Sequence, residues 1–222
     1  MTILWNVQLK KSYQHELRPF HLDMQFQSNA QRLVLFGPSG AGKTQILKMI
    51  AGLTQPDIGL IQFNGRALLD SQLGLNQKPQ ERSLAYVFQD YALFPHLTVR
   101  QNVAFSTHPS WFNKGKFYST PRVDEWLYKL RLTELANHYP YQLSGGQAQR
   151  VALARAFVSE PLGLLLDEPF AALDQDLRKA LREELKSLLQ ELSIPMILIS
   201  HDPEDVAIFG EEVIAIEGGR KV

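Results

Sequence analysis

Apolar runs and segments with helical spacing alternate along most of the chain. Apolar runs bounded by glycine, proline or polar residues are typical of buried strands. The strand-like stretches are RLVLF (32–36), GLIQFNG (59–65), SLAYVFQ (83–89), LGLLL (162–166), PMILIS (195–200) and EVIAIEGG (212–219). Residues 1–36 as a whole predict short strands, whereas the polar stretch at 67–82 predicts a loop.

Helical spacing appears in the segments between these runs. The first predicted helix buries a face made of Ile46, Leu47, Ile50 and Leu53. A long helix at 174–192 has its apolar face at Leu177, Leu181, Leu185, Leu188 and Leu192. Between about 91 and 160, aromatic residues, prolines and helical spacing replace the strand signals, which indicates a helical insert.

This order of elements predicts an α/β fold with a mostly parallel, doubly wound sheet. We expect one domain over residues 1–222. Its α/β core comprises about 1–90 and 161–222 and includes an N-terminal antiparallel β part, and about 91–160 form the helical subdomain.

Composition narrows the function classes. The 222 residues carry 23 basic and 23 acidic side chains, and this neutral balance argues against a general nucleic-acid binder. The chain has no cysteine, which excludes disulfides and thiolate metal sites. The N-terminus does not resemble a secretion signal, and no apolar run approaches the roughly 20 residues that span a bilayer.

The sequence GPSGAGKT at 37–44 predicts a phosphate-binding loop, because it follows a strand and precedes a helix. Its backbone N–H groups can surround phosphate oxygens, Lys43 can neutralise the β and γ phosphates, and the Thr44 hydroxyl can ligate Mg²⁺. The expected nucleotide-binding residues are Gly37, Pro38, Ser39, Gly40, Ala41, Gly42, Lys43 and Thr44.

Two further motifs have the chemistry of a nucleotide site. Asp167 and Glu168 directly follow the strand at 162–166, where an aspartate can hold Mg²⁺ and a glutamate can polarise the attacking water. LSGGQAQR at 143–150 places two glycines and a serine at a helix start, which also favours an anion.

Together these motifs resemble the ABC-type ATPases, and the resemblance covers essentially the whole chain. The motifs occur in the family's order: GPSGAGKT, VFQD, LSGGQ, LLLDEP, AALD and ISHD. The resemblance implies ATP and Mg²⁺ as cofactors and a head-to-tail homodimer. In such a dimer Ser144, Gly145, Gly146 and Gln147 meet the γ-phosphate of the partner's ATP.

The resemblance also implies roles for single residues. Gln89 corresponds to the mobile glutamine that contacts Mg²⁺ or the lytic water, and His201 to the switch histidine at the γ-phosphate. Asp174 corresponds to the aspartate that links the two sites, although it also reads as a simple N-cap. Tyr13 stands where family members place an aromatic ring against adenine. Gln45 is a departure, because many members have serine or threonine there.

The leading functional prediction is the energy subunit of a membrane importer, peripheral at the cytoplasmic face of the inner membrane. Separate transmembrane permease subunits would dock near 90–106, where Tyr91, Leu93 and Phe94 look exposed or else belong to the helical core. A substrate-binding protein would be an indirect partner. A soluble ABC-type ATPase acting on nucleic acid is a more distant alternative than an importer of another solute. The basic, aromatic stretch 111–122 reads more readily as solvated surface, and no nucleic-acid partner is expected.

The cargo is predicted from one segment only. GRALLDSQLGLNQKPQERSLAYVFQDYALFPHLTV most resembles the ATPase subunits of molybdate importers, and less so those for sulfate, polyamines or iron. An exporter is a weaker alternative. The importer ATPases that this segment resembles tend to carry an additional C-terminal β-domain, whereas this sequence stops at EGGRKV, after its last predicted strand.

Overall fold

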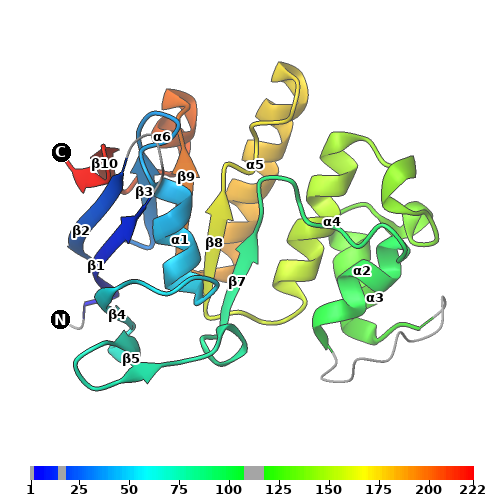
Figure 1. Cartoon of the computed structure of the whole chain (residues 1–222). Helices are drawn as coiled ribbons and strands as arrows, with labels where there is room; N and C mark the ends of the chain where they lie inside the picture. Colours follow the sequence, from blue (N-terminus) through cyan, green and yellow to red (C-terminus); the bar gives the residue numbers. More distant parts are fainter. Residues whose placement is uncertain (1–2, 15–18, 108–117) are drawn as a thin grey trace.

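The computed structural model describes residues 3–14, 19–107 and 118–222, and in these ranges the chain forms two β-sheets and a group of helices (Figure 1). The first sheet is antiparallel and has the strand order β2-β1-β4-β5-β6. Its strands are β1 (Trp5–Tyr13), β2 (Phe20–Ser28), β4 (Ile58–Phe63), β5 (Arg66–Asp70) and β6 (Leu75–Asn76). This is the expected N-terminal antiparallel part.

The second sheet has the order β11-β10-β3-β9-β8-β7 and is parallel except for its β10–β11 pair. Its strands are β3 (Arg32–Phe36), β7 (Leu84–Val87), β8 (Gly163–Asp167), β9 (Met196–Ser200), β10 (Glu212–Glu217) and β11 (Arg220–Lys221). The described helices are α1 (Lys43–Ala51), α2 (Val99–Ala104), α3 (Pro121–Lys129), α4 (Gly145–Phe157), α5 (Gln175–Leu192) and α6 (Pro203–Phe209). Short 3₁₀ turns occur at Pro79–Glu81, Phe105–Thr107, Thr133–Leu135 and Pro140–Gln142.

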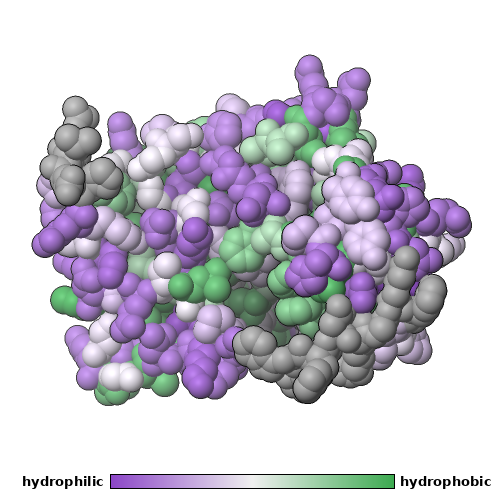
Figure 2. Space-filling model, turned by 45° about the vertical axis from the view of Figure 1, so that its right-hand side comes forward, coloured by the Kyte–Doolittle hydropathy of each residue, from purple (hydrophilic) through white to green (hydrophobic). Residues whose placement is uncertain are grey.

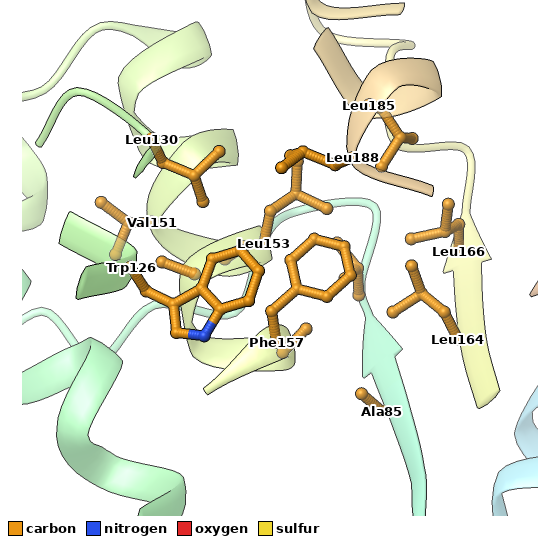
Figure 3. Close-up of a cluster of buried hydrophobic side chains, with 14 of the residues drawn as sticks. Ala85, Trp126, Leu130, Val151, Leu153, Phe157, Leu164, Leu166, Leu185 and Leu188 are labelled. Atoms are coloured by element: carbon orange, nitrogen blue, oxygen red, sulfur yellow. The ribbon is translucent and has the colours of Figure 1, made fainter. Parts of the chain in front are cut away.

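The parallel sheet is buried on both faces, which explains why its strands are continuously apolar. Side chains alternate along each strand, so Leu165 packs with α1 and the antiparallel sheet while Leu164 and Leu166 pack with the helical side. Figure 3 shows the cluster on the helical side, in which helices α3, α4 and α5 meet strands β7 and β8. Trp126 of α3 stacks on Phe157 of α4 with ring centroids 4.9 Å apart.

The α/β fold, the parallel sheet and the helical insert are as the sequence predicts. The expected loop at 67–82 is wrong in part, because residues Arg66–Asp70 form β5 and pair with β4. Leu68 and Leu69 are buried there despite their polar neighbours. Leu53 is also not part of the apolar helix face. It is 43% exposed, because α1 ends at Ala51 and Gly52 turns the chain in a left-handed conformation.

No helix within the described ranges is both long and apolar enough to cross a membrane.

Candidate nucleotide-binding site

The loop between β3 and α1 has a backbone that requires glycine. Gly40 and Gly42 have φ values of 81° and 95°, which side-chain-bearing residues rarely adopt. A Cβ at Gly37 would lie only 2.1 Å from the carbonyl oxygen of Ile216. The chain therefore wraps closely enough for its N–H groups to surround a phosphate at the start of α1.

The Lys43 side chain lies buried at the centre of this loop. Its ammonium donates hydrogen bonds to the carbonyl oxygens of Gly37 (2.8 Å) and Pro38 (2.9 Å). Its Nζ atom is also 3.8 Å from the Glu168 carboxylate. A fixed positive charge in this position can meet the β and γ phosphates of a bound nucleotide.

Thr44 and Asp167 place two oxygen ligands side by side next to the loop. The Thr44 hydroxyl donates to Asp167 Oδ1 at 2.9 Å, and the Tyr86 hydroxyl donates to Oδ2 at 2.8 Å. Burial raises the pKa of Asp167, and these two hydrogen bonds oppose that rise. Hydroxyl and carboxylate oxygens are ligands that Mg²⁺ prefers, so the pair suits a Mg²⁺ ion that also binds phosphate.

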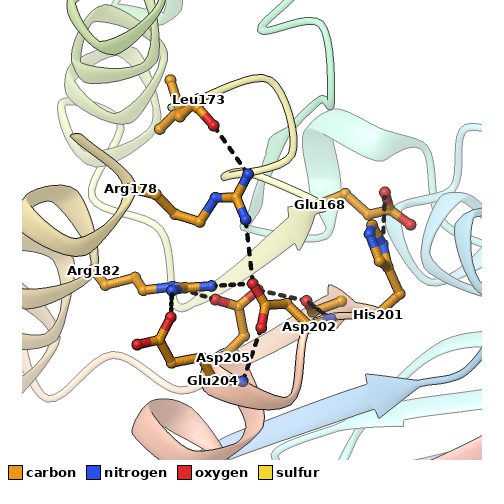
Figure 4. A network of polar contacts seen from close by, with 9 residues as sticks. Glu168, Leu173, Arg178, Arg182, His201, Asp202, Glu204 and Asp205 are labelled. Atoms are coloured by element: carbon orange, nitrogen blue, oxygen red, sulfur yellow. Dashed lines mark hydrogen bonds and ion pairs between the residues drawn. The ribbon is translucent and has the colours of Figure 1, made fainter. Parts of the chain in front are cut away.

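Glu168 and His201 come from the ends of neighbouring strands β8 and β9 and face each other (Figure 4). His201 Nδ1 lies 3.4 Å from Glu168 Oε2. The Glu168 backbone has φ 45°, a left-handed conformation that costs energy in a residue with a Cβ.

Lys43, Thr44 and Glu168 line a pocket of ≈ 480 Å³, and that volume suits a small ligand. Asp167 and His201 do not line it but contact Thr44 and Glu168, which do. Gln89 and Tyr13, both expected from the sequence, line it. Its lining residues are Tyr13, Phe20, Ser39, Gly40, Ala41, Gly42, Lys43, Thr44, Gln45, Gln89 and Glu168.

Sequence reasoning missed two functional neighbours in this site, Phe20 and Tyr86. No motif marks them, because each reaches the site through pairing of β2 or β7 within a sheet. Gln45, noted as a departure from the family, accepts a hydrogen bond from the Tyr13 hydroxyl at 3.0 Å. Burial raises the pKa of Tyr13 above its ordinary value.

Five of the predicted residues form a separate surface, which we call the signature face: Ser144, Gly145, Gly146, Gln147 and Asp174. None of them lines the pocket. The Ser144 and Gln147 side chains cap the start of α4 reciprocally, and the Asp174 carboxylate accepts from the Leu177 N–H as the N-cap of α5. A Cβ at Gly145 would lie 3.4 Å from the Leu173 side chain, so the two helix starts are adjacent.

The expected permease-docking residues differ in exposure. Leu93 and Phe94 are half-buried, whereas Tyr91 is only 8% exposed, so for Tyr91 the alternative of a core position holds and exposure does not. The backbone of Tyr91 is left-handed, with φ 63°, and forms part of a turn. The Tyr91 ring packs into the core together with residues of α4. Most of the stretch 111–122 lies outside the described residues.

Comparison with known proteins identifies the family. A family model described as ABC transporter matches residues 21–171. The chain belongs to the ABC transporter family. It is an ATP-binding cassette, and proteins of this kind are ATPases that use ATP with Mg²⁺. The dimeric ATP-binding cassette MJ0796, solved in a post-hydrolysis state with ADP and Pi, is 29% identical with a TM-score of 0.78, and the match covers 98% of this chain and 96% of that one.

Three curated relatives of this ATP-binding cassette are import ATP-binding proteins. A sulfate/thiosulfate import ATP-binding protein of Bradyrhizobium diazoefficiens is 46% identical over 194 residues, 86% of this chain and 55% of its own length. An Fe(3+) ions import ATP-binding protein of Pectobacterium atrosepticum is 42% identical over 205 residues, 92% of this chain and 56% of its own. A spermidine/putrescine import ATP-binding protein of Nitratidesulfovibrio vulgaris is 43% identical over 192 residues, 86% and 50% respectively. The chain thus spans about half the length of these relatives.

Proposed function

We propose that this cassette binds and hydrolyses MgATP as the energy subunit of a membrane importer. The observation that carries the proposal is the convergence of Lys43, Thr44 and Glu168 on one pocket, with Asp167 hydrogen-bonded to Thr44. Such a pocket supplies phosphate-neutralising charge, Mg²⁺ ligands and a carboxylate near the position of an attacking water.

The pocket residues divide the work of phosphoryl transfer. Lys43 and the loop N–H groups hold the β and γ phosphates, while Thr44 and Asp167 orient Mg²⁺. Glu168 accepts the proton of the water, and His201 contacts the γ-phosphate from the end of the neighbouring strand β9. Gln89, at the exposed edge of the pocket, reports the presence of nucleotide to the segment that follows it, and Tyr13 packs against the adenine.

The signature face completes the site of a second copy. Ser144 and Gly145 are exposed at the start of α4, and neither of them lines the nucleotide pocket of its own chain. In a head-to-tail dimer the N–H groups of residues 144–147 would meet the γ-phosphate held by the partner's loop. Asp174, adjacent to this turn, would then lie at the dimer interface. The dimeric cassette of known structure supports the formation of a dimer.

Permease subunits would bind an apolar region after Gln89. Phe94 and Phe105 are in contact with ring centroids 4.3 Å apart, and Phe105 is 55% exposed. Separately from this pair, one face of the molecule has a hollow with apolar and polar side chains around it (Figure 2). Binding to permease subunits would hold this protein at the cytoplasmic face of the inner membrane.

The relatives favour sulfate/thiosulfate, iron or polyamine cargo over molybdate, and sulfate/thiosulfate has the highest identity of the three. The residues that suggested molybdate have structural roles here. Asp70 accepts two backbone hydrogen bonds in a turn, Ser71 accepts one from Gly59, and Arg82 is a buried helix cap. We therefore propose import of an inorganic oxyanion of the sulfate class.

A direct test compares ATP binding and Mg²⁺-dependent hydrolysis of the chain with those of Lys43→Met. We expect this variant to lose nucleotide affinity, because the loop loses its buried cation. Lys186→Met is the control, because it removes the same charge from α5 and Lys186 does not line the pocket. Equal ATP affinity in Lys43→Met and the native chain, or no hydrolysis by the native chain, would contradict the proposal.

A further inference from the structure

Two segments that carry proposed site residues face each other beside the nucleotide pocket. The segment 168–174 begins at Glu168 and ends at Asp174, and the segment 200–205 contains His201. Two arginines of α5, Arg178 and Arg182, lie between them (Figure 4). None of the sequence motifs includes either arginine.

Arg182 is the buried anchor of this contact, with its side chain 2% exposed. Its guanidinium donates to Asp202 Oδ2 and Asp205 Oδ1, each at 2.6 Å, and also to Glu204. The same group lies 5.7 Å from the ring centroid of Phe170. Arg182 therefore contacts both segments, and its charge is compensated by carboxylates as burial demands.

Arg178 contacts the same two segments, next to Asp174 in one and next to His201 in the other. Its Nη2 donates to the carbonyl oxygen of Leu173 at 2.9 Å, directly before Asp174. Its Nη1 donates to Asp202 Oδ2 at 3.4 Å, directly after His201. Asp202 also caps α6 through its other oxygen, so the turn that carries His201 is fixed by hydrogen bonds on both sides.

We infer that Arg178 is a positioning residue that couples the turn of Asp174 to the His201–Glu168 pair. The inference rests on the proposed function, because it assigns Arg178 to the hydrolytic step of that site. Movement of the signature face on dimer formation would shift the Leu173 carbonyl. Arg178 would transmit that shift through Asp202 to the imidazole that lies 3.4 Å from Glu168. Arg178 does not line the nucleotide pocket, so ATP binding should not depend on it.

The test replaces Arg178 by methionine, which keeps most of the side-chain length and removes both donors. We expect kcat for ATP to fall by about tenfold or more, because small misplacement of reacting groups is costly. KM for ATP should stay within about twofold. Lys179→Met is the matched control, since it removes the same charge from the next, exposed position of α5 and should leave both constants unchanged.

A second readout follows His201 itself. The imidazole NMR signal of His201, assigned by its loss in His201→Gln, should shift in Arg178→Met and not in Lys179→Met. Unchanged kcat together with an unshifted His201 signal would overturn the inference. So would equal losses of kcat and ATP affinity, because these would indicate general damage to the domain. If the native chain itself hydrolyses no ATP, the proposed function fails, whereas the NMR comparison still decides whether Arg178 positions His201.

Discussion

Glu168 and Asp167 are adjacent, yet their surroundings give them different chemistry. Asp167 is the last residue of β8, is buried, and accepts two hydroxyl hydrogen bonds. Glu168 leaves the strand in a left-handed conformation, which turns its carboxylate into the pocket. The strain of that backbone, on the order of 1–3 kcal/mol, is typical of residues whose orientation matters for function.

We predict that Glu168→Gln retains ATP binding and loses roughly 10²–10⁴-fold in turnover, the usual effect of removing a positioned base. The amide keeps the shape of the side chain but cannot accept the proton. Steady-state hydrolysis together with equilibrium ATP binding measures both quantities. Native turnover in this variant would remove Glu168 from the role of base.

Asp167 gives a prediction on pH and stability. Because burial raises its pKa above that of the unfolded chain, the unfolded chain ionises first as the pH rises. The ionised carboxylate therefore has no effect on the free energy of unfolding below about pH 4, where Asp167 is protonated in both states. As the pH rises from there to the raised pKa of the folded chain, the folded state is progressively destabilised, and above that pKa the effect is constant.

Asp167→Asn should consequently raise the thermal unfolding midpoint of the nucleotide-free chain at pH 7. The gain should shrink toward about pH 4. The same variant should lose Mg²⁺-dependent hydrolysis, because it lacks the charged ligand. Thermal unfolding at the two pH values measures this, and a midpoint at pH 7 equal to or below that of the native chain would contradict it.

At the scale of elements, Arg82 holds the end of α1 in place. It is 1% exposed, and its guanidinium donates to the carbonyl oxygens of Met49 and Ile50 at 2.8 Å and of Gln77 at 2.9 Å. Burial lowers its pKa to about 10, which leaves it charged at neutral pH. A cation at a helix C-terminus compensates the unpaired carbonyls and the helix dipole.

We predict that Arg82→Met lowers the free energy of unfolding by about 2 kcal/mol, because buried carbonyl groups lose their donors. Denaturant unfolding measures this change. Arg66→Met is the control, since Arg66 is exposed and makes a single bond to the Glu81 carbonyl. Equal stability of the two variants would show that Arg82 does not stabilise α1.

The elements also show how far sequence patterns reach. The strands β3, β8 and β9 and the long helix α5 follow directly from continuous apolar runs and leucine spacing. Strand β5 does not, because its buried leucines are followed by polar residues that belong to a turn. The pair Asn64–Gly65, with φ values of 49° and 76°, is the signal that could have revealed the β4–β5 hairpin.

At the scale of the whole molecule, most of the residues that line the pocket belong to sequence motifs, but the motifs could not predict how these residues lie relative to one another. Phosphate-loop chemistry is local, so Gly37–Thr44 could be assigned from spacing alone. Contacts such as Tyr86 with Asp167 depend on which strands are neighbours, and the buried position of Tyr91 depends on how its turn faces α4. The cargo could not be read from the chain, because the residues that suggested it have structural roles in turns and at a helix end.

The central claim is that the signature face acts on a nucleotide held by a second copy. Light scattering in ATP tests it most directly, using Glu168→Gln to prevent hydrolysis. We expect this variant to change from a 25.2 kDa monomer to a dimer when ATP is added. Adding Ser144→Arg should keep the chain monomeric while its ATP affinity stays unchanged. A double variant that still dimerises with ATP, or that no longer binds ATP as a monomer, would contradict the claim.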